Sequence, residues 1–234
     1  AIERLRPFGS RFTPVLSSFD DYLESAAPDI ADAILFDLGI SMFHYVESER
    51  GFSFRRDEKL DMRLNPEEGI SAADIVNGYQ EEALADVIYR YGEERYSRRI
   101  ARAIVARRQE KAIERSAELA EIIAGAVPRE YRYGRIHPAT RTFQALGIEV
   151  NGELSRIEPA LRSAIRVLRK GGRIGVITFH SLEDRIVKWF FKDEAAKEDP
   201  EIRIITKKPI VPSEKEEEEN APSRSAKLRV IEKI

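Results

Sequence analysis

A short apolar strand that ends on an acid and a glycine most constrains the fold of this chain. Residues 33–41 read AILFDLGIS, in which an unbroken apolar run, residues 33–36, precedes Asp37 and Gly39. Such a run is typical of a strand buried on both faces in a parallel sheet covered by helices. Ligands of open α/β sheets bind outside the carboxyl ends of the strands, so Asp37 is a candidate site residue. The alternative is that Asp37 caps a turn or the next helix.

A second strand of the same kind is predicted over residues 173–179, and it ends on His180 and Ser181. A long helical stretch precedes it, with an interruption near Pro159 and stop signals at Gly171 and Gly172. The pattern therefore predicts an α/β fold in which both strands end on polar residues.

The two ends of the chain add shorter elements. Residues 12–16 are predicted as a strand, and residues 19–25, FDDYLES, as an amphipathic helix. Phe19 would either lie against a flat ligand or form a hydrophobic staple. Residues 201–209 and 227–234 alternate like an antiparallel pair of strands, and the acidic run EKEEEEN between them is predicted as a solvated loop.

The middle of the chain leaves this βα rhythm. Residues 51–66 look like a loop, and helices are predicted over residues 72–79, 82–91, 93–110 and 117–127. The third helix carries a basic stripe made of Arg95, Arg98, Arg99 and Arg102. Acids at its start, Glu93 and Glu94, would suit the helix dipole and leave the arginines for phosphate. The alternative is a solvated face with acidic partners.

Composition excludes several classes of chemistry. None of the 234 residues is cysteine, so a thiol nucleophile and a thiolate metal site are excluded, and a reducing cytoplasm is the expected location. No apolar run reaches the length of a membrane span, and the first residues lack a signal-peptide pattern. The net charge is −2, so a nucleic-acid partner would be held by a local patch.

Six blocks along the chain point to one family: ILFDLGIS, RGFSF with LDMR, YGEERYSRRIARAIV, HPATRTFQAL, GGRIGVITFHSLEDRIVK and SRSAKLRV. In this order they resemble the RsmH (formerly MraW) family of bacterial ribosomal RNA methyltransferases. The resemblance implies methyl transfer from S-adenosylmethionine to the exocyclic amine N(4) of a decoding-region (P-site) cytidine in 16S rRNA. The assembled small ribosomal subunit is the expected partner, with no membrane, and the choice between monomer and homodimer stays open.

The family resemblance also implies an organisation. It predicts a class I (Rossmann-like) S-adenosylmethionine-dependent methyltransferase sheet with an inserted all-helical domain. Residues 1–44 and 137–234 would form the methyltransferase domain, and residues 45–136 the substrate-recognition insert. The family's glycine-rich loop and the acid after its second strand have no counterpart here, so the chain is expected to be part of a longer one that supplies two further strands.

Family positions that contact the cofactor map onto Phe19, Asp37 and His44. Many members carry glutamine in place of His44, and since both side chains donate and accept hydrogen bonds, the contact is expected to persist. Many members also carry a large side chain where this chain has Gly147, which puts one local contact in that helix in doubt.

The chemistry requires acceptors for a poorly nucleophilic amine, and Asp37 or the backbone carbonyls after it would supply them. Methylation of the cytosine ring carbon normally needs a cysteine, so its absence favours the amine. Candidates for stacking on a flipped base are Tyr45, Phe52 and Phe54, with core packing expected for at least one of them.

Candidates for backbone phosphates are Arg55, Arg56 and Arg63 together with the basic stripe. His180 and Ser181 would order Asp37 or the RNA, or form a purely structural turn. No cluster has the spacing of a metal site. Two other classes compete with this reading: an RNA-binding or ribosome-assembly protein without catalysis, and a nucleotide-dependent oxidoreductase on a similar sheet.

Overall fold

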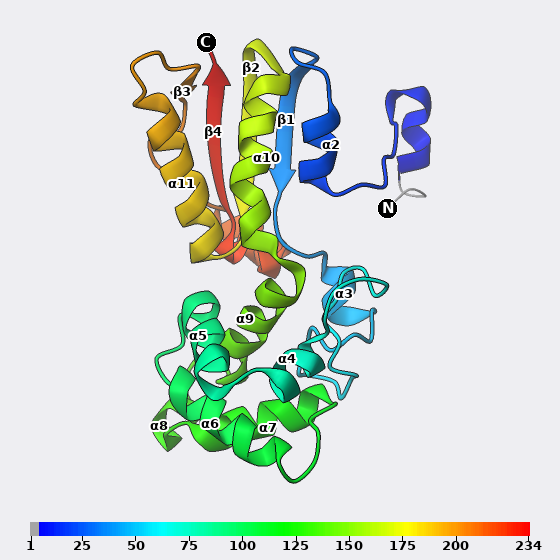
Figure 1. Cartoon of the computed structure of the whole chain (residues 1–234). Helices are drawn as coiled ribbons and strands as arrows, with labels where there is room; N and C mark the ends of the chain where they lie inside the picture. Colours follow the sequence, from blue (N-terminus) through cyan, green and yellow to red (C-terminus); the bar gives the residue numbers. More distant parts are fainter. Residues whose placement is uncertain (1–4) are drawn as a thin grey trace. The chain divides into compact units, whose positions relative to one another are not determined.

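The computed structural model describes residues 5–234 and divides into two compact units (Figure 1). Unit 1 is formed by the residues up to Leu38 together with Ser155–Ile234, and unit 2 by Gly39–Leu154. The predicted α/β fold with an all-helical insertion is confirmed, because every named strand lies in unit 1 while unit 2 is helical.

Unit 1 is built around a mixed sheet with the strand order β1-β2-β4-β3. Its strands are β1 (Ala31–Asp37), β2 (Leu168–Thr178), β3 (Ile202–Ile204) and β4 (Lys227–Lys233). β1 and β2 run parallel, whereas β4 is antiparallel to both of its neighbours. The predicted second strand and the predicted antiparallel pair are therefore confirmed.

β1 lies at the edge of this sheet and is less buried than its apolar sequence predicts. Phe36 is buried, but Leu35 is 67% exposed. The expected burial on both faces is wrong because β1 pairs with β2 alone among the described strands. The strand predicted over residues 12–16 is also absent, since this extended segment pairs with no described strand and Leu16 is fully exposed.

The helices of unit 1 precede the strands in the sequence or connect them. They are η1 (Arg6–Arg11), α2 (Phe19–Ser25), α10 (Glu153–Val167), α11 (Ser181–Ala195), α12 (Glu214–Glu219) and η2 (Ala221–Ser225). α11 packs against β2, β3 and β4. The acidic run predicted as a loop forms α12 instead, because Ser213 caps it and acids in its first turn suit the helix dipole.

Two glycine-containing turns differ from their predicted roles. The helical stretch breaks at Gly152, whose φ is +60°, whereas Pro159 lies inside α10. α10 ends at Val167, so Gly171 and Gly172 belong to an irregularity within β2. A Cβ on Gly172 would lie 2.9 Å from the Asp32 carbonyl oxygen, which makes glycine necessary for this close approach to β1.

Unit 2 consists of short helices and one long loop. The helices are α3 (Met42–Val46), α4 (Ala72–Gly78), α5 (Glu81–Gly92), α6 (Ser97–Arg108), α7 (Ser116–Ala126), α8 (Arg129–Arg132) and α9 (Ala139–Asn151). The predicted helices are confirmed, although α6 begins at Ser97 and not at residue 93. Glu93 adopts a left-handed conformation with a φ of +49° and ends α5 instead.

The compact helical unit extends beyond the expected insert of residues 45–136. It includes α9, because α9 packs closely along α5. A Cβ on Gly92 would lie only 2.6 Å from the backbone oxygen of Arg141. The core of this unit is apolar, with Ile88, Ile100 and Leu146 completely buried.

Candidate functional site

Asp37 lies at the carboxyl edge of the parallel strand pair. It is opposite Ile177 in the ladder, and the Leu38 amide donates a 3.1 Å hydrogen bond to the Ile177 oxygen. The side chain is exposed, and no described residue bonds to or pairs with its carboxylate. The helix that follows is capped by Ser41, whose Oγ accepts from the Phe43 amide at 3.3 Å. The capping alternative for Asp37 is therefore wrong, and its carboxylate is available to a ligand.

Phe19 is the first residue of α2 and packs beside β1. Its ring meets that of Phe36 edge to face, with 6.0 Å between the centroids, and 39% of the residue stays exposed. A hydrophobic staple would use the residue before the N-cap, which here is Ser17, so that alternative is excluded. Because Phe36 adjoins Asp37 in the chain, the exposed part of Phe19 lies near the carboxyl end of β1.

His180 caps α11. Its Nδ1 accepts from the Glu183 amide at 3.4 Å, and its Nε2 lies 3.2 Å from Glu183 Oε1. The other carboxylate oxygen of Glu183 accepts from the backbone amides of Phe179 and His180. Ser181 starts the helix and is exposed. These hydrogen bonds give a defined geometry to the alternative in which the turn is purely structural. In this geometry His180 orders the end of β2.

A buried ion pair holds α11 against β4, and sequence reasoning missed it. Arg229 Nε lies 2.7 Å from Asp184 Oδ1, and Lys227 Nζ lies 3.3 Å from Oδ2. Burial would raise the pKa of Asp184, but hydrogen bonding to Arg229 and the charges of Arg229 and Lys227 outweigh burial and hold this pKa below its usual value. Asp184 and Arg229 both lie in sequence blocks that carry the family resemblance. That resemblance is the only sequence signal that marked these two residues.

In unit 2, His44 lies on α3 among aromatic rings. Its ring meets Phe43 at 5.6 Å and Phe52 at 5.5 Å between centroids, both edge-on. Its Nδ1 is buried and has no hydrogen-bond partner. A buried polar atom without a partner is costly, so this nitrogen suits a ligand that supplies the missing hydrogen bond.

The three aromatic candidates for base stacking have different surroundings. Phe52 is 5% exposed and belongs to the core, which removes it from the RNA candidates. Phe54 is half-buried and stacks on His137 at 4.5 Å, an interaction that the sequence did not reveal. Burial lowers the pKa of His137, which favours its neutral form in this stack. Tyr45 is 42% exposed and is the aromatic residue of the three that best suits a base.

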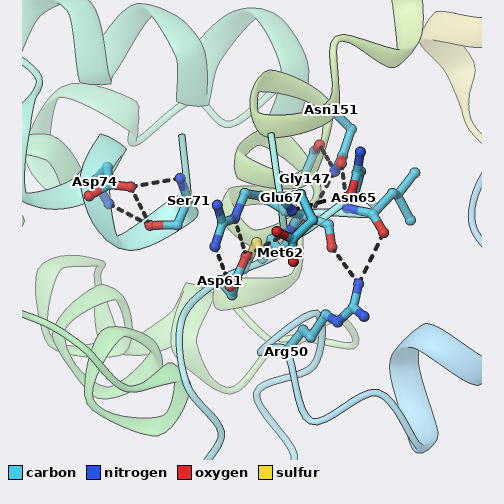
Figure 2. A network of polar contacts seen from close by, with 11 residues as sticks. Arg50, Asp61, Met62, Asn65, Glu67, Ser71, Asp74, Gly147 and Asn151 are labelled. Carbon is cyan, nitrogen blue, oxygen red and sulfur yellow. Dashed lines mark hydrogen bonds and ion pairs between the residues drawn. The ribbon is translucent and has the colours of Figure 1, made fainter. Parts of the chain in front are cut away.

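The loop of residues 51–66 is held by α9 (Figure 2). Asn151 Nδ2 donates to the carbonyls of Met62, at 2.8 Å, and Gly147, at 2.9 Å. Its Oδ1 accepts from the Leu64 amide at 2.8 Å. One amide side chain thus fixes the loop to the end of α9. A Cβ on Gly147 would meet nothing within 4 Å, so the absence of a large side chain there leaves open space.

The same network engages Arg63, one of the phosphate candidates. Its guanidinium forms two hydrogen bonds to the Asp61 carboxylate, at 2.7 and 2.9 Å, which hold the pKa of Asp61 below its usual value. Arg50 donates to the backbone oxygens of Arg63 and Leu64 at 3.0 Å (Figure 2). The geometry gives Arg63 a structural role in closing the loop.

The remaining arginine candidates divide into paired and unpaired side chains. Arg56 donates to the Val46 oxygen at 2.6 Å, and Arg102 lies 3.5 Å from a Glu81 carboxylate oxygen. In the described part of the chain no carboxylate pairs with the other four, which are Arg55, Arg95, Arg98 and Arg99. These four stay candidates for phosphate.

Glu94 differs most from its predicted position. It is completely buried, and its carboxylate accepts hydrogen bonds from the Tyr96 amide, at 2.8 Å, and from the Tyr131 hydroxyl. Burial and the hydrogen bond to Glu94 raise the pKa of Tyr131 to about 12. The acid therefore acts as a buried acceptor and does not face solvent at a helix start.

Residues 5–234 contain neither a metal-binding cluster nor a membrane-spanning helix. No group of three or more His, Asp or Glu side chains is arranged to hold a metal ion. None of the helices there is both long enough and apolar enough to span a bilayer.

A family model described as "MraW methylase family" matches residues 1–234. The chain belongs to this family. Three curated relatives, each named "Ribosomal RNA small subunit methyltransferase H", match all of the chain. The relative from Treponema denticola is 54% identical and is covered over 79% of its length; that from Carboxydothermus hydrogenoformans is 48% identical and covered over 80%. The relative from Nostoc punctiforme is 48% identical and covered over 75%.

Membership in the MraW methylase family confirms the resemblance drawn from the six sequence blocks. It also decides between two of the classes left open: the chain is an enzyme of the methyltransferase class and not an oxidoreductase. The sheet of unit 1 is accordingly part of a class I methyltransferase fold.

Proposed function

We propose that this protein methylates the exocyclic amine N(4) of a decoding-region cytidine in 16S rRNA, within the small ribosomal subunit. The name that its relatives carry supports small-subunit rRNA as the substrate. The observation that carries the chemistry is the exposed, unpaired carboxylate of Asp37 at the carboxyl edge of β1 and β2. We expect the reaction to take place in the cytoplasm.

The acceptor amine needs help because its lone pair is delocalised into the cytosine ring. A hydrogen-bond acceptor beside N(4) draws the amine out of conjugation, so that the lone pair points at the incoming methyl carbon. Asp37 supplies such an acceptor, and it carries negative charge where the nitrogen develops positive charge. As the nitrogen–carbon bond forms, the bond between the methyl carbon and the sulfonium sulfur would break, and the proton lost by the amine would pass to solvent.

S-adenosylmethionine supplies an electrophilic methyl group on a sulfonium. Three side chains are suited to contact this cofactor. Phe19 and Asp37 belong to unit 1, and His44 belongs to unit 2. Phe19 offers an exposed aromatic surface, and Asp37 offers an unpaired carboxylate for hydroxyl donors. His44 offers a buried nitrogen without a partner. These residue types recognise flat rings and hydroxyl groups in a ligand.

The division of labour that we propose follows the two domains predicted from the sequence. The sheet, with residues 1–44 and 137–234, would carry out methyl transfer, and the helical insert around residues 45–136 would recognise RNA. Tyr45, Arg55 and Arg56 are the exposed candidates from the first half of the insert, and Arg56 also donates to the Val46 oxygen. His180 and Ser181 are proposed to order the β2 end of the site.

The test is methyl transfer from radiolabelled S-adenosylmethionine to purified small subunits that lack the modification. Nucleoside mass spectrometry then identifies the methylated atom. We expect N(4)-methylcytidine from the unaltered protein, and a loss of at least about 100-fold in kcat for Asp37→Asn, in line with removal of one catalytic electrostatic group.

The matched control is Asp86→Asn, which changes an exposed acid of α5 that pairs only with Arg90, at 3.8 Å. Its activity should equal that of the unaltered protein. Methylation of another atom, or full activity of Asp37→Asn, would contradict the assignment. Retained RNA binding with no methyl transfer by the unaltered protein would favour the RNA-binding class instead.

A further inference from the structure

An arginine packs over two tyrosine rings just before α6. The Arg95 guanidinium carbon lies 4.8 Å from the ring centroid of Tyr96 and 5.2 Å from that of Tyr131. The two rings meet edge to face at 4.9 Å. Arg95 is nevertheless exposed, so the guanidinium is fixed in orientation while remaining accessible to solvent.

A buried acid keeps this arrangement in place. Glu94 accepts from the Tyr96 amide at 2.8 Å and from the Tyr131 hydroxyl, and no part of it reaches solvent. It thereby connects the backbone before α6 to α8, which carries Tyr131. Glu94 is a positioning residue for the two rings, and its position explains why a carboxylate beside three arginines leaves them unpaired.

Further arginines surround the same rings. Arg99 lies 5.9 Å above the Tyr96 ring, and Arg98 is exposed and forms no hydrogen bond, ion pair or ring contact with a described residue. Arg141, from α9, donates to the Glu93 backbone oxygen at 2.9 Å. The charges of Arg141 and Arg95 both act on the Tyr131 phenol. Arginines from two segments distant in sequence thus converge on one surface.

Three other arginines of unit 2 have acidic partners. Arg90 pairs with Asp86, Arg102 with Glu81, and Arg107 with Glu118. Within the described residues no such partner exists for Arg95, Arg98 or Arg99. In a chain with a net charge of −2, this concentration of uncompensated charge is a local feature and not a consequence of composition.

We infer that this arginine–tyrosine surface, made of Arg95, Tyr96, Arg98, Arg99 and Tyr131, binds single-stranded RNA outside the methyl-transfer site. Guanidinium forks match phosphate oxygens, and a guanidinium already stacked on tyrosines presents a flat outer face on which an unpaired base stacks. An acidic peptide would use the charges but not the flat face. The identity of the RNA as small-subunit rRNA rests on the proposed function.

The test measures binding of a fluorescein-labelled single-stranded RNA by anisotropy over a range of salt concentrations. We expect Arg95→Gln/Arg99→Gln to bind more weakly and to flatten the slope of log K against log salt by about 0.7 for each lost phosphate contact. The control Arg90→Gln removes an exposed charge that is already paired with Asp86, and its slope should equal that of the unaltered protein.

Arg98→Gln guards against a folding artefact, because the Arg98 side chain forms no hydrogen bond, ion pair or ring contact with a described residue that its loss would break. We expect it to flatten the slope by about 0.7 as well. Slopes unchanged in both variants would overturn the inference. Binding of polyglutamate as tight as that of RNA, and equally sensitive to the variants, would also overturn it, by marking the surface as a site for acidic protein.

The inference and the proposed function fail in different ways. If the inference holds, the double variant should raise KM for small subunits and keep kcat, since the reacting groups are untouched. If the unaltered protein transfers no methyl group, the proposed function fails, but the RNA-binding slopes still report on the surface. If the double variant has a normal KM and normal salt slopes, the proposed function stands and the inferred RNA-binding surface is rejected.

Discussion

Asn151, the last residue of α9, donates a side-chain hydrogen bond to the backbone of Met62, with 2.8 Å between Nδ2 and the carbonyl oxygen (Figure 2). The same amide also bonds Gly147 and Leu64. Asn151→Ala should lower the free energy of unfolding of unit 2 by about 1–3 kcal/mol, because two backbone groups of the loop, one of them the carbonyl of the buried Met62, lose their partner. Far-UV circular dichroism during denaturation measures this loss.

Asn65→Ala is the control for Asn151→Ala. Asn65 is exposed and its side chain accepts only from the Glu67 amide, at 3.2 Å. Its replacement should change stability by less than about 0.5 kcal/mol. An equal loss in both variants would show that the loop is not held through Asn151.

Two glycines of unit 2 should respond to alanine in opposite directions. Gly92→Ala places a Cβ 2.6 Å from the Arg141 oxygen, so we expect a loss of about 1–3 kcal/mol from overpacking between α5 and α9. Gly147→Ala places a Cβ in open space inside α9 and should stabilise by about 0.5–1 kcal/mol. Thermal unfolding of both variants checks the prediction, and a stabilising Gly92→Ala would contradict the close helix contact.

Arg229→Ala should destabilise unit 1 by about 3–5 kcal/mol, because it leaves the Asp184 carboxylate buried without its main partner. Trp189 on α11 is the only tryptophan, so its fluorescence reports unfolding of this unit. Lys215→Ala is the control, since Lys215 forms an exposed pair with Glu219 on α12.

Acid should weaken the same ion pair. The folded-state pKa of Asp184 lies below 3.8, its value in the unfolded chain. The stability that the pair contributes is therefore complete above pH 3.8 and is lost as the pH falls through the lower folded-state pKa. Arg229→Ala should remove this part of the acid dependence, and an unchanged acid profile would argue against the pair.

Tyr131 should make unit 2 sensitive to alkali. Its pKa rises from 10 in the unfolded chain to about 12 in the folded one, so its contribution is complete below pH 10 and is lost between pH 10 and 12. The unfolding free energy should fall there by at most about 1.4 kcal/mol per pH unit from this group.

Tyr131→Phe should abolish that part of the alkaline slope. It should also destabilise the protein at neutral pH by about 1–3 kcal/mol, because Glu94 loses a hydrogen-bond donor in a fully buried site. Tyr89→Phe, a change at an exposed tyrosine, serves as the control. Identical pH profiles in the two variants would contradict the role of the Glu94 hydrogen bond.

Sequence patterns predicted the elements whose formation depends on neighbouring residues. The strands at Asp37 and before His180, the helices of the insert and the antiparallel pair at the end all follow from local periodicity. The six blocks identified the family for the same reason: they consist of contiguous residues. Element boundaries were less predictable, since α6 starts only after the left-handed Glu93 and the buried Glu94.

Only the tertiary structure decided which candidate side chains are accessible. Phe52 and Arg63 match the expected residue types, yet one is buried in the core and the other is paired with Asp61. Arg95 and Asp37 stay available because no oppositely charged side chain among residues 5–234 pairs with them. Burial and ion pairing join residues far apart in the chain, so local sequence determines the elements of this protein and long-range packing determines which of its groups can meet a ligand.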